Sequence, residues 1–268
     1  MNEFLTVLLL TALPALGNFL GGLLAEAVDV SRRVLSLALH GAAGIVLAVV
    51  GIELIPEAFE AEPAWIVILA FVAGGSFFVA VDVLIERLQE RASRADVVGP
   101  GVTSPLLDRA DQLGATNRST QTKGGAWAIF FGVAVDLFSD GVAIGTGSSI
   151  EFGLGLLLAL GQVPGDLPEG FATIAAFKEQ GVPRRMRLLL SASFLIPILL
   201  GAIISYLALR GQPQIYKLSL LAFTAGILLT VAVEEIIPEA HREGDARLAT
   251  FCFVGGFALF ALLSAYLG

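Results

Sequence analysis

The chain has 268 residues, of which 56% are apolar and only 15% are charged. Soluble domains carry roughly 25% charged residues, so this composition excludes an ordinary soluble protein and predicts an integral membrane protein. The net charge of −8 argues against a nucleic-acid partner and is compatible with binding cations. The single cysteine, Cys252, excludes an intramolecular disulfide and a thiolate metal cluster.

Eight apolar segments are long enough to cross a bilayer as helices, which takes about 20 residues each. They are 4–25, 34–59, 64–86, 125–149, 152–177, 187–209, 215–240 and 247–267. No basic residue precedes the first, so we expect a retained span and not a signal peptide. The sequence therefore predicts an all-α integral membrane protein with eight transmembrane helices, forming a single domain over residues 1–268.

One connection is long, and the basic residues set the orientation. Residues 87–124 are polar and rich in Gly, Ser, Thr and Arg, which predicts a mobile cytoplasmic loop between spans 3 and 4. With the loop after span 1 inside, 14 of the 16 basic residues lie on the inner side, and only Arg210 and Lys217 lie outside. The positive-inside rule then predicts a multi-pass protein of the cell (plasma) membrane with both termini outside.

Four carboxylates lie near the middle of spans 4 and 5. Asp136 and Asp140 are four residues apart, and Asp166 and Glu169 are three apart, so each pair shares one helix face. Gln162 precedes Asp166 by one turn on roughly the same face. Two adjacent helices can therefore present four carboxylates and an amide to one another, which predicts a metal site.

Two further acidic clusters lie at other depths. The outer cluster consists of Glu53 and Glu57, near the outer end of span 2, and the inner cluster of Glu235, Glu239 and His241, at the inner end of span 7. An acid at the centre of a membrane helix costs about 2.5–3.5 kcal/mol on insertion scales. Acids at three successive depths therefore indicate a path for a cation, and we predict that both clusters also bind metal.

Two other polar residues in the spans have simpler explanations. His40, at the inner end of span 2, is expected to be a polar residue of the membrane interface. Asp82, near the inner end of span 3, is expected to pair with Arg87 or to reach the interface. Neither is predicted to bind metal.

A short motif occurs twice in opposite orientations. ELIPEA begins at Glu53 and EIIPEA begins at Glu235, on spans that run in opposite directions. SDGVAI in span 4 and PEGFAT in span 5 are related in the same way. Such recurrence is typical of inverted-repeat transporters, whose site lies at the midplane between the halves. We predict that spans 1–3 are related to spans 6–8, with spans 4 and 5 central.

Taken together, these residues resemble the ZIP family of divalent metal transporters. The family's fourth span typically reads His-Asn-x-x-Glu-Gly and its fifth His-Glu-x-Pro-Glu-Gly, where this chain has DLFSDG and GDLPEG. EEIIPEAHR in span 7 and GNFLGGLLAE in span 1 also look like bacterial members. The resemblance implies a ZIP-like inverted-repeat bundle and inward transport of a divalent cation. Relatives are often dimers, so it also implies a homodimer as a possible assembly.

The chain departs from the family pattern at the centre. By this alignment Asp136 takes the place of a histidine, Leu137 of an asparagine and Ile196 of a glutamate. The central ligands are then all oxygen atoms, which suit harder cations than imidazole sites do. We expect the metal ion to be the substrate and to be harder than zinc, with Mn or Fe favoured and Zn, Cd and Co as alternatives.

Two other functions are compatible with the sequence. The departures would also fit a ZIP-like membrane protein that binds metal or a partner without transport. Aspartates on adjacent spans, with VPGD before one of them, fit an intramembrane aspartyl protease, but that function leaves Asp140 and Glu169 unused. We therefore predict a transporter and not an enzyme, whose partners are the lipid bilayer and a divalent cation.

Overall fold

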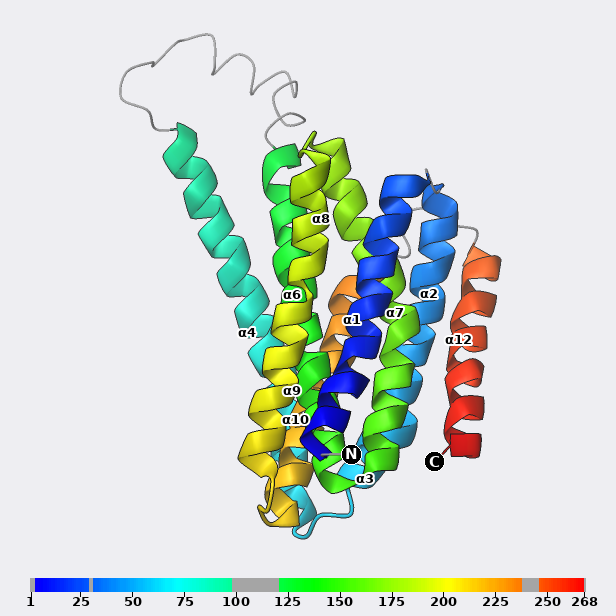
Figure 1. The fold of residues 1–268 in the computed structure, drawn as a ribbon. Coiled ribbons are helices and arrows are strands. Elements are labelled where there is room, and N and C mark those ends of the chain that lie inside the picture. The colour runs from blue at the N-terminus through cyan, green and yellow to red at the C-terminus, as the bar shows by residue number, and fades with distance from the viewer. Residues whose placement is uncertain (1–2, 29–30, 98–120, 238–245, 268) are drawn as a thin grey trace.

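The computed structural model describes residues 3–28, 31–97, 121–237 and 246–267, and this part of the chain consists of helices and short turns without strands. The elements in chain order are α1 (Glu3–Ala27), α2 (Arg32–Ala48), η1 (Val49–Leu54), α3 (Ile55–Ala58), α4 (Ala64–Val97), α6 (Gln121–Ile150), α7 (Phe152–Glu179), α8 (Arg184–Ser193), α9 (Leu195–Leu209), α10 (Gln214–Val231), η2 (Ala232–Ile236) and α12 (Ala246–Leu267). The long helices form one bundle, with α1 beginning and α12 ending at the same end (Figure 1). The predicted all-α class is confirmed.

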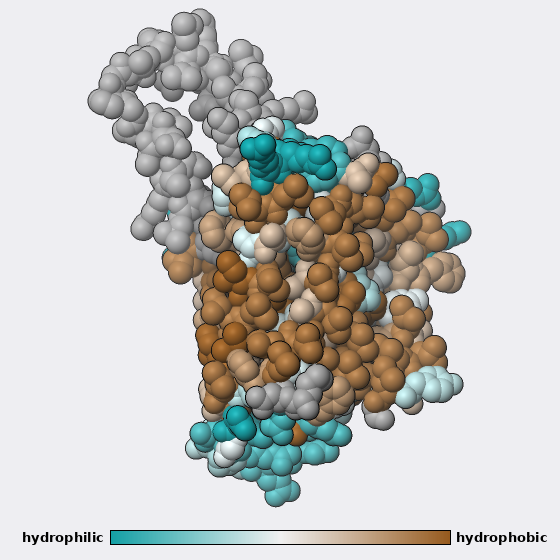
Figure 2. All heavy atoms as spheres, in the orientation of Figure 1, coloured by the Kyte–Doolittle hydropathy of each residue, from teal (hydrophilic) through white to brown (hydrophobic). Residues whose placement is uncertain are grey.

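The bundle has the surface of a membrane protein. Hydrophobic side chains form a broad belt around its middle, and hydrophilic side chains gather at both ends (Figure 2). Seven helical segments are long and apolar enough to span a bilayer. The predicted span that is not among these seven is the fifth, α7, whose hydropathy is lowered by the polar residues Gln162, Asp166 and Glu169. The count of eight therefore stays a prediction.

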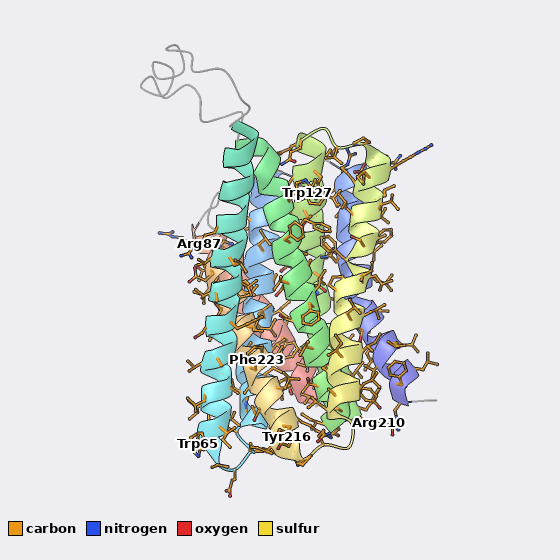
Figure 3. All side chains as sticks on the ribbon, turned by 90° about the vertical axis from the view of Figure 1, so that its left-hand side faces the viewer. Trp65, Arg87, Trp127, Arg210, Tyr216 and Phe223 are labelled. Carbon is orange, nitrogen blue, oxygen red and sulfur yellow. The ribbon has the colours of Figure 1, made fainter. Side chains whose placement is uncertain are left out.

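Aromatic side chains mark the two ends of the belt. Trp65 and Tyr216 are 60% and 59% exposed near one end, and Trp127 is 44% exposed toward the other (Figure 3). Tryptophan and tyrosine favour the boundary between hydrocarbon and water, because their rings are apolar and their N–H or O–H groups are polar. Their placement agrees with a bilayer that covers the belt.

Two tight turns share the pattern Gly-x-Pro. Gly181, after α7, and Gly211, after α9, have φ values of +72° and +75°. Glycine ends a helix in this left-handed region without steric cost. Pro183 and Pro213 then precede α8 and α10 as N-caps, and their missing N–H is no loss at the start of a helix.

Four pairs of helices approach each other closely through glycine. The pairs are α1 with α7, α6 with α9, α4 with α10, and α2 with α12, and the contacts include Gly21 with Leu167, Gly141 with Ile198, Gly74 with Phe223 and Gly44 with Phe253. A Cβ atom at any of these glycines would collide with the backbone of its partner. The predicted repeat exchanges α1 with α9, α2 with α10, α4 with α12 and α6 with α7. Under this exchange the pair α1–α7 becomes α9–α6, and the pair α4–α10 becomes α12–α2. The inverted repeat stays a prediction, which this pairing supports.

The glutamate that begins each copy of the repeated motif lies in a π-helical segment. Glu53 lies in the π-helical segment η1 and Glu235 in the π-helical segment η2. Such turns are rare and occur frequently at functional sites. Val49 at the start of η1, and Val231 just before η2, both line the central cavity described below.

Candidate metal site

Three of the four predicted central carboxylates converge. Asp136 and Asp140 of α6 and Asp166 of α7 each offer one oxygen, and these oxygens lie within 4.8 Å of one another. The three residues are 6%, 2% and 2% exposed, respectively. The spacing of four residues puts both aspartates of α6 on the face that meets α7, so the neighbouring helix only has to present Asp166 to complete the group.

Gln162 links the two helices within this group. Its Nε2 donates a hydrogen bond to Oδ1 of Asp140 over 2.7 Å, and the residue is 4% exposed. This bond fixes the orientation of the Asp140 carboxylate. Gln162 precedes Asp166 by one helical turn. One face of α7 therefore supplies both the carboxylate of Asp166 and the amide that donates to Asp140.

A small cavity of about 10 Å³ lies between these side chains. Its lining consists of the three aspartates, Gln162, Glu169, Gly161 and Gly165, with Val46 and Val49 from the second span and Leu228 and Val231 from α10. One water molecule needs about 10–15 Å³ of such space. The cavity therefore has room for a single small particle, and a cation that enters it must shed most of its water.

Glu169 borders this cavity and contacts the group through a side-chain hydrogen bond with Asp136. It is half-buried and lines the cavity from α7. Its oxygens are not part of the set that lies within 4.8 Å. The predicted site of four carboxylates is thus drawn together as three aspartates, with the glutamate alongside.

The outer cluster is larger than the sequence suggested. Glu57 is half-buried, and Glu60, Glu151 and Glu53 lie close enough to act on its charge. Glu151 is the N-cap of α7 and sits between spans 4 and 5. A single acid in a tight turn gives almost no sequence signal, which is why this residue was missed.

The inner cluster stays a prediction. Glu235 lies in η2, and the structure gives no description of its side chain. Glu239 and His241 lie outside the described residues.

The positions that depart from the ZIP pattern carry hydrocarbon side chains. Leu137 is fully buried and packs with Ala15 of α1 and Ile198 of α9. Ile196 is 60% exposed on the outside of the bundle. Neither side chain has an atom that can bind a metal ion.

Two buried polar residues differ from what the sequence indicated. His40 is only 4% exposed, with its Nδ1 at 2.8 Å from the carbonyl oxygen of Ser36, so the expectation of an interfacial side chain is wrong. It lies two turns inside α2, where neighbouring helices cover it. Asn18 of α1 is fully buried against Gly170, and neither amide atom has a hydrogen-bond partner among the described residues. It was not predicted, because one asparagine in an apolar run resembles helix-packing sequence.

The helical bundle, its apolar belt and its buried carboxylates define a multi-pass membrane protein with a candidate cation site. The family model of the ZIP zinc transporters matches residues 3–264. The chain therefore belongs to the ZIP family, whose members are transporters and not enzymes.

Full-length bacterial relatives agree with this assignment. The chain is 27% identical to the zinc transporter ZupT of Chlorobium luteolum and 26% identical to that of Chlorobium phaeovibrioides, over 98% of each chain in both cases. It is also 34% identical to the zinc transporter GufA of Myxococcus xanthus, over 53% of this chain and 56% of that protein.

Proposed function

We propose that this protein carries a divalent cation across the membrane through the carboxylate site between α6 and α7. The observation that carries the proposal is the convergence of Asp136, Asp140 and Asp166 on a cavity of about 10 Å³. Membership of the ZIP family, and relatives named as zinc transporters, support the same function.

The electrostatics of the site favour a cation as its ligand. Burying even one ionised carboxylate costs several kcal/mol, and neighbouring carboxylates repel each other strongly in a low dielectric. A divalent cation between the oxygens offsets both effects, because it supplies the opposite charge and takes the place of lost water. The three buried aspartates are therefore best explained by an ion that passes between them.

The donor set favours a hard cation. We assign Asp136, Asp140, Asp166 and Glu169 as ligands, with Gln162 orienting Asp140 or binding through its own amide oxygen. Carboxylate and amide oxygens suit Mn²⁺ better than they suit the ions that prefer imidazole or thiolate. The proposed substrate is therefore harder than zinc, with Mn²⁺ or Fe²⁺ first and Zn²⁺, Cd²⁺ and Co²⁺ as the alternatives to be measured.

The proposed path runs inward through the three acidic clusters. Glu53 and Glu57, with Glu151 beside them, attract the cation at the outer mouth. The ion sheds water at the central site and leaves past Glu235, Glu239 and His241. Release follows a relative movement of the two helix groups of the predicted repeat. This scheme places the protein in the plasma membrane with both termini outside, and a homodimer is its expected assembly.

The decisive experiment is metal entry into proteoliposomes. Mn²⁺, Fe²⁺, Zn²⁺, Cd²⁺, Co²⁺, Mg²⁺ and Ca²⁺ are supplied separately to vesicles that contain the wild type, Asp140→Ala or Glu169→Ala. Asp82→Ala serves as the matched control, because Asp82 is an acid of span 3 that does not line the cavity. We expect saturable entry of at least one ion, abolished in both site variants and retained in the control.

A second candidate function is metal binding without transport. The observation that favours it is the hydrocarbon at positions 137 and 196. This function predicts that folded, inserted protein binds Mn²⁺ at the central site with no entry of any ion. Binding measured by calorimetry on the same preparations separates the two functions.

The aspartyl protease is a remote third candidate. It would use Asp136 and Asp166, which do converge. It gives no role to Asp140 or to Gln162, which belong to the same group. Binding of an active-site protease inhibitor that depends on Asp136 and not on metal would favour it.

A further inference from the structure

A second cavity, of about 440 Å³, opens on the outside of the bundle. It lies between α4 and α10 on one side and α6 and α9 on the other, on the face that Figure 3 shows. Its walls include Phe77, Phe138, Ile204 and Phe223, and no charged residue of the described chain lines it. We call it the lateral groove. We propose that the lateral groove is a binding site for one acyl chain of a membrane lipid.

The hydroxyl groups in the lateral groove have no hydrogen left to donate to a polar ligand. Ser139 donates to the carbonyl of Val135, at 3.1 Å, and Thr224 to that of Leu220, at 2.7 Å. Ser205 donates to the carbonyl of Ala202, at 3.3 Å. All three hydrogens are therefore used within their own helices. A polar ligand would lose its hydrogen bonds to water here and find no free donor in the groove, whereas an apolar chain loses no hydrogen bond.

The lateral groove is continuous with the surface that contacts the bilayer. Phe77, Phe131 and Ile204 line it and are also 51%, 50% and 54% exposed. It follows α6 past Ser139, at the depth of the two site aspartates on that helix. Lipid tails fill this depth of a membrane, so a lipid chain is the apolar molecule in immediate contact with the opening.

The volume distinguishes an acyl chain from a helix of another copy. A single turn of α-helix with its side chains, about 5.4 Å long and 10–12 Å wide, fills about 420–610 Å³. The lateral groove therefore holds no more than one turn, whereas a spanning helix is about 30 Å long. A flexible hydrocarbon chain can follow the groove and fill it.

This inference does not depend on the proposed transport function, but it concerns the same helix. Val135 and Ser139 line the lateral groove, while Asp136 and Asp140 line the small cavity of the candidate metal site. A lipid chain in the groove thus contacts the back of the segment that carries two of the three clustered aspartates.

Quenching by brominated lipid tests the site. The chain has two tryptophans, Trp65 and Trp127, and both are replaced by Phe. Phe223→Trp then places a reporter in the lateral groove. Val72→Trp is the matched control, because Val72 is 56% exposed and lies two residues from Gly74, which touches Phe223. Each protein is reconstituted into phosphatidylcholine with a rising fraction of the same lipid carrying brominated chains.

The shape of the quenching curve is the readout. We expect the fluorescence of the groove reporter to fall in direct proportion to the brominated fraction, because a single bound acyl chain quenches it. The control has several chains around it and should lose fluorescence more steeply. Ala208→Phe, which adds bulk in the groove, should remove most of the quenching at position 223. If Phe223→Trp does not fold, Val142→Trp replaces it, with Leu200→Trp as its exposed control.

Three results would overturn the inference. Equal steepness at the two positions would make the groove an ordinary part of the lipid-facing belt. No quenching of the groove reporter in fully brominated lipid would mean that the groove is closed, or that a second copy fills it. Quenching that Ala208→Phe leaves unchanged would place the chain elsewhere.

Discussion

The three aspartates of the central group owe their positions to helical spacing and to helix packing. Asp136 and Asp140 share a face because of helical spacing, and Gln162 holds Asp140 through a hydrogen bond of 2.7 Å. Asp166 reaches them only because α7 packs beside α6. Residue spacing therefore explains why the two aspartates of α6 lie together, and helix packing explains why Asp166 joins them.

The identity of residue 136 should control which metal is preferred. Replacing its carboxylate by imidazole adds the ligand type that zinc favours over Mn²⁺. We expect Asp136→His to raise zinc entry relative to Mn²⁺ entry by about tenfold or more, measured by competition in proteoliposomes. An unchanged metal ranking would contradict the idea that this position sets the preference.

The missed residue Glu151 should affect the outer mouth. Removing its charge weakens attraction of the cation toward Glu57, so Glu151→Gln should raise the KM for metal entry a few-fold at low ionic strength and leave kcat unchanged. The effect should vanish at high salt, because salt screens exposed charges. Glu62→Gln is the control, since Glu62 is exposed and is not among the charges that act on Glu57. A salt-independent effect would instead indicate direct binding.

At the scale of elements, an ion pair and a neighbouring hydrogen bond join three helices at the end of the bundle away from the termini. Arg187 of α8 pairs with both carboxylate oxygens of Glu26 of α1 and donates to the carbonyl of Val182. Lys178 of α7 donates to the carbonyl of Ala25 at 3.2 Å. The Arg187 and Glu26 side chains are 11% and 5% exposed, so the pair is shielded from solvent.

Breaking this pair should destabilise the fold. Arg187→Met leaves the Glu26 carboxylate without its main partner, which costs about 2 kcal/mol for a charged hydrogen-bonded group. We expect a lower apparent melting temperature in detergent. Arg184→Met should change it little, because Arg184 is 73% exposed and 3.6 Å from Glu26. Equal effects of the two substitutions would show that total charge matters more than geometry.

At the scale of the whole molecule, the first and last helices have their free ends at the same end of the bundle. α1 begins and α12 ends at one end of the bundle, while the turn between α7 and α8 lies at the other (Figure 1). The glycine contacts divide the helices into four close pairs that the predicted repeat maps onto one another. The orientation in the membrane rests on the distribution of basic residues.

Cysteine labelling tests that orientation. In a Cys252→Ser background, we expect a membrane-impermeant thiol reagent to label Gln212→Cys on intact cells. Glu179→Cys should be labelled only after permeabilisation, because it lies in the predicted inner turn. The reverse pattern would invert the orientation and with it the assignment of outer and inner clusters.

The sequence by itself determined the helical membrane class, the approximate positions of the long helices and the faces on which the central acids lie. These features follow from apolar run length and from the 3.6-residue period, which act within one helix. Only the tertiary structure decided that three aspartates form the tight group while Glu169 stands beside it, that Glu151 joins the outer cluster, that His40 is buried, and that a groove opens between two helix pairs. The reason is physical: these features depend on which faces of separate helices meet, and glycine contacts between distant segments set that arrangement.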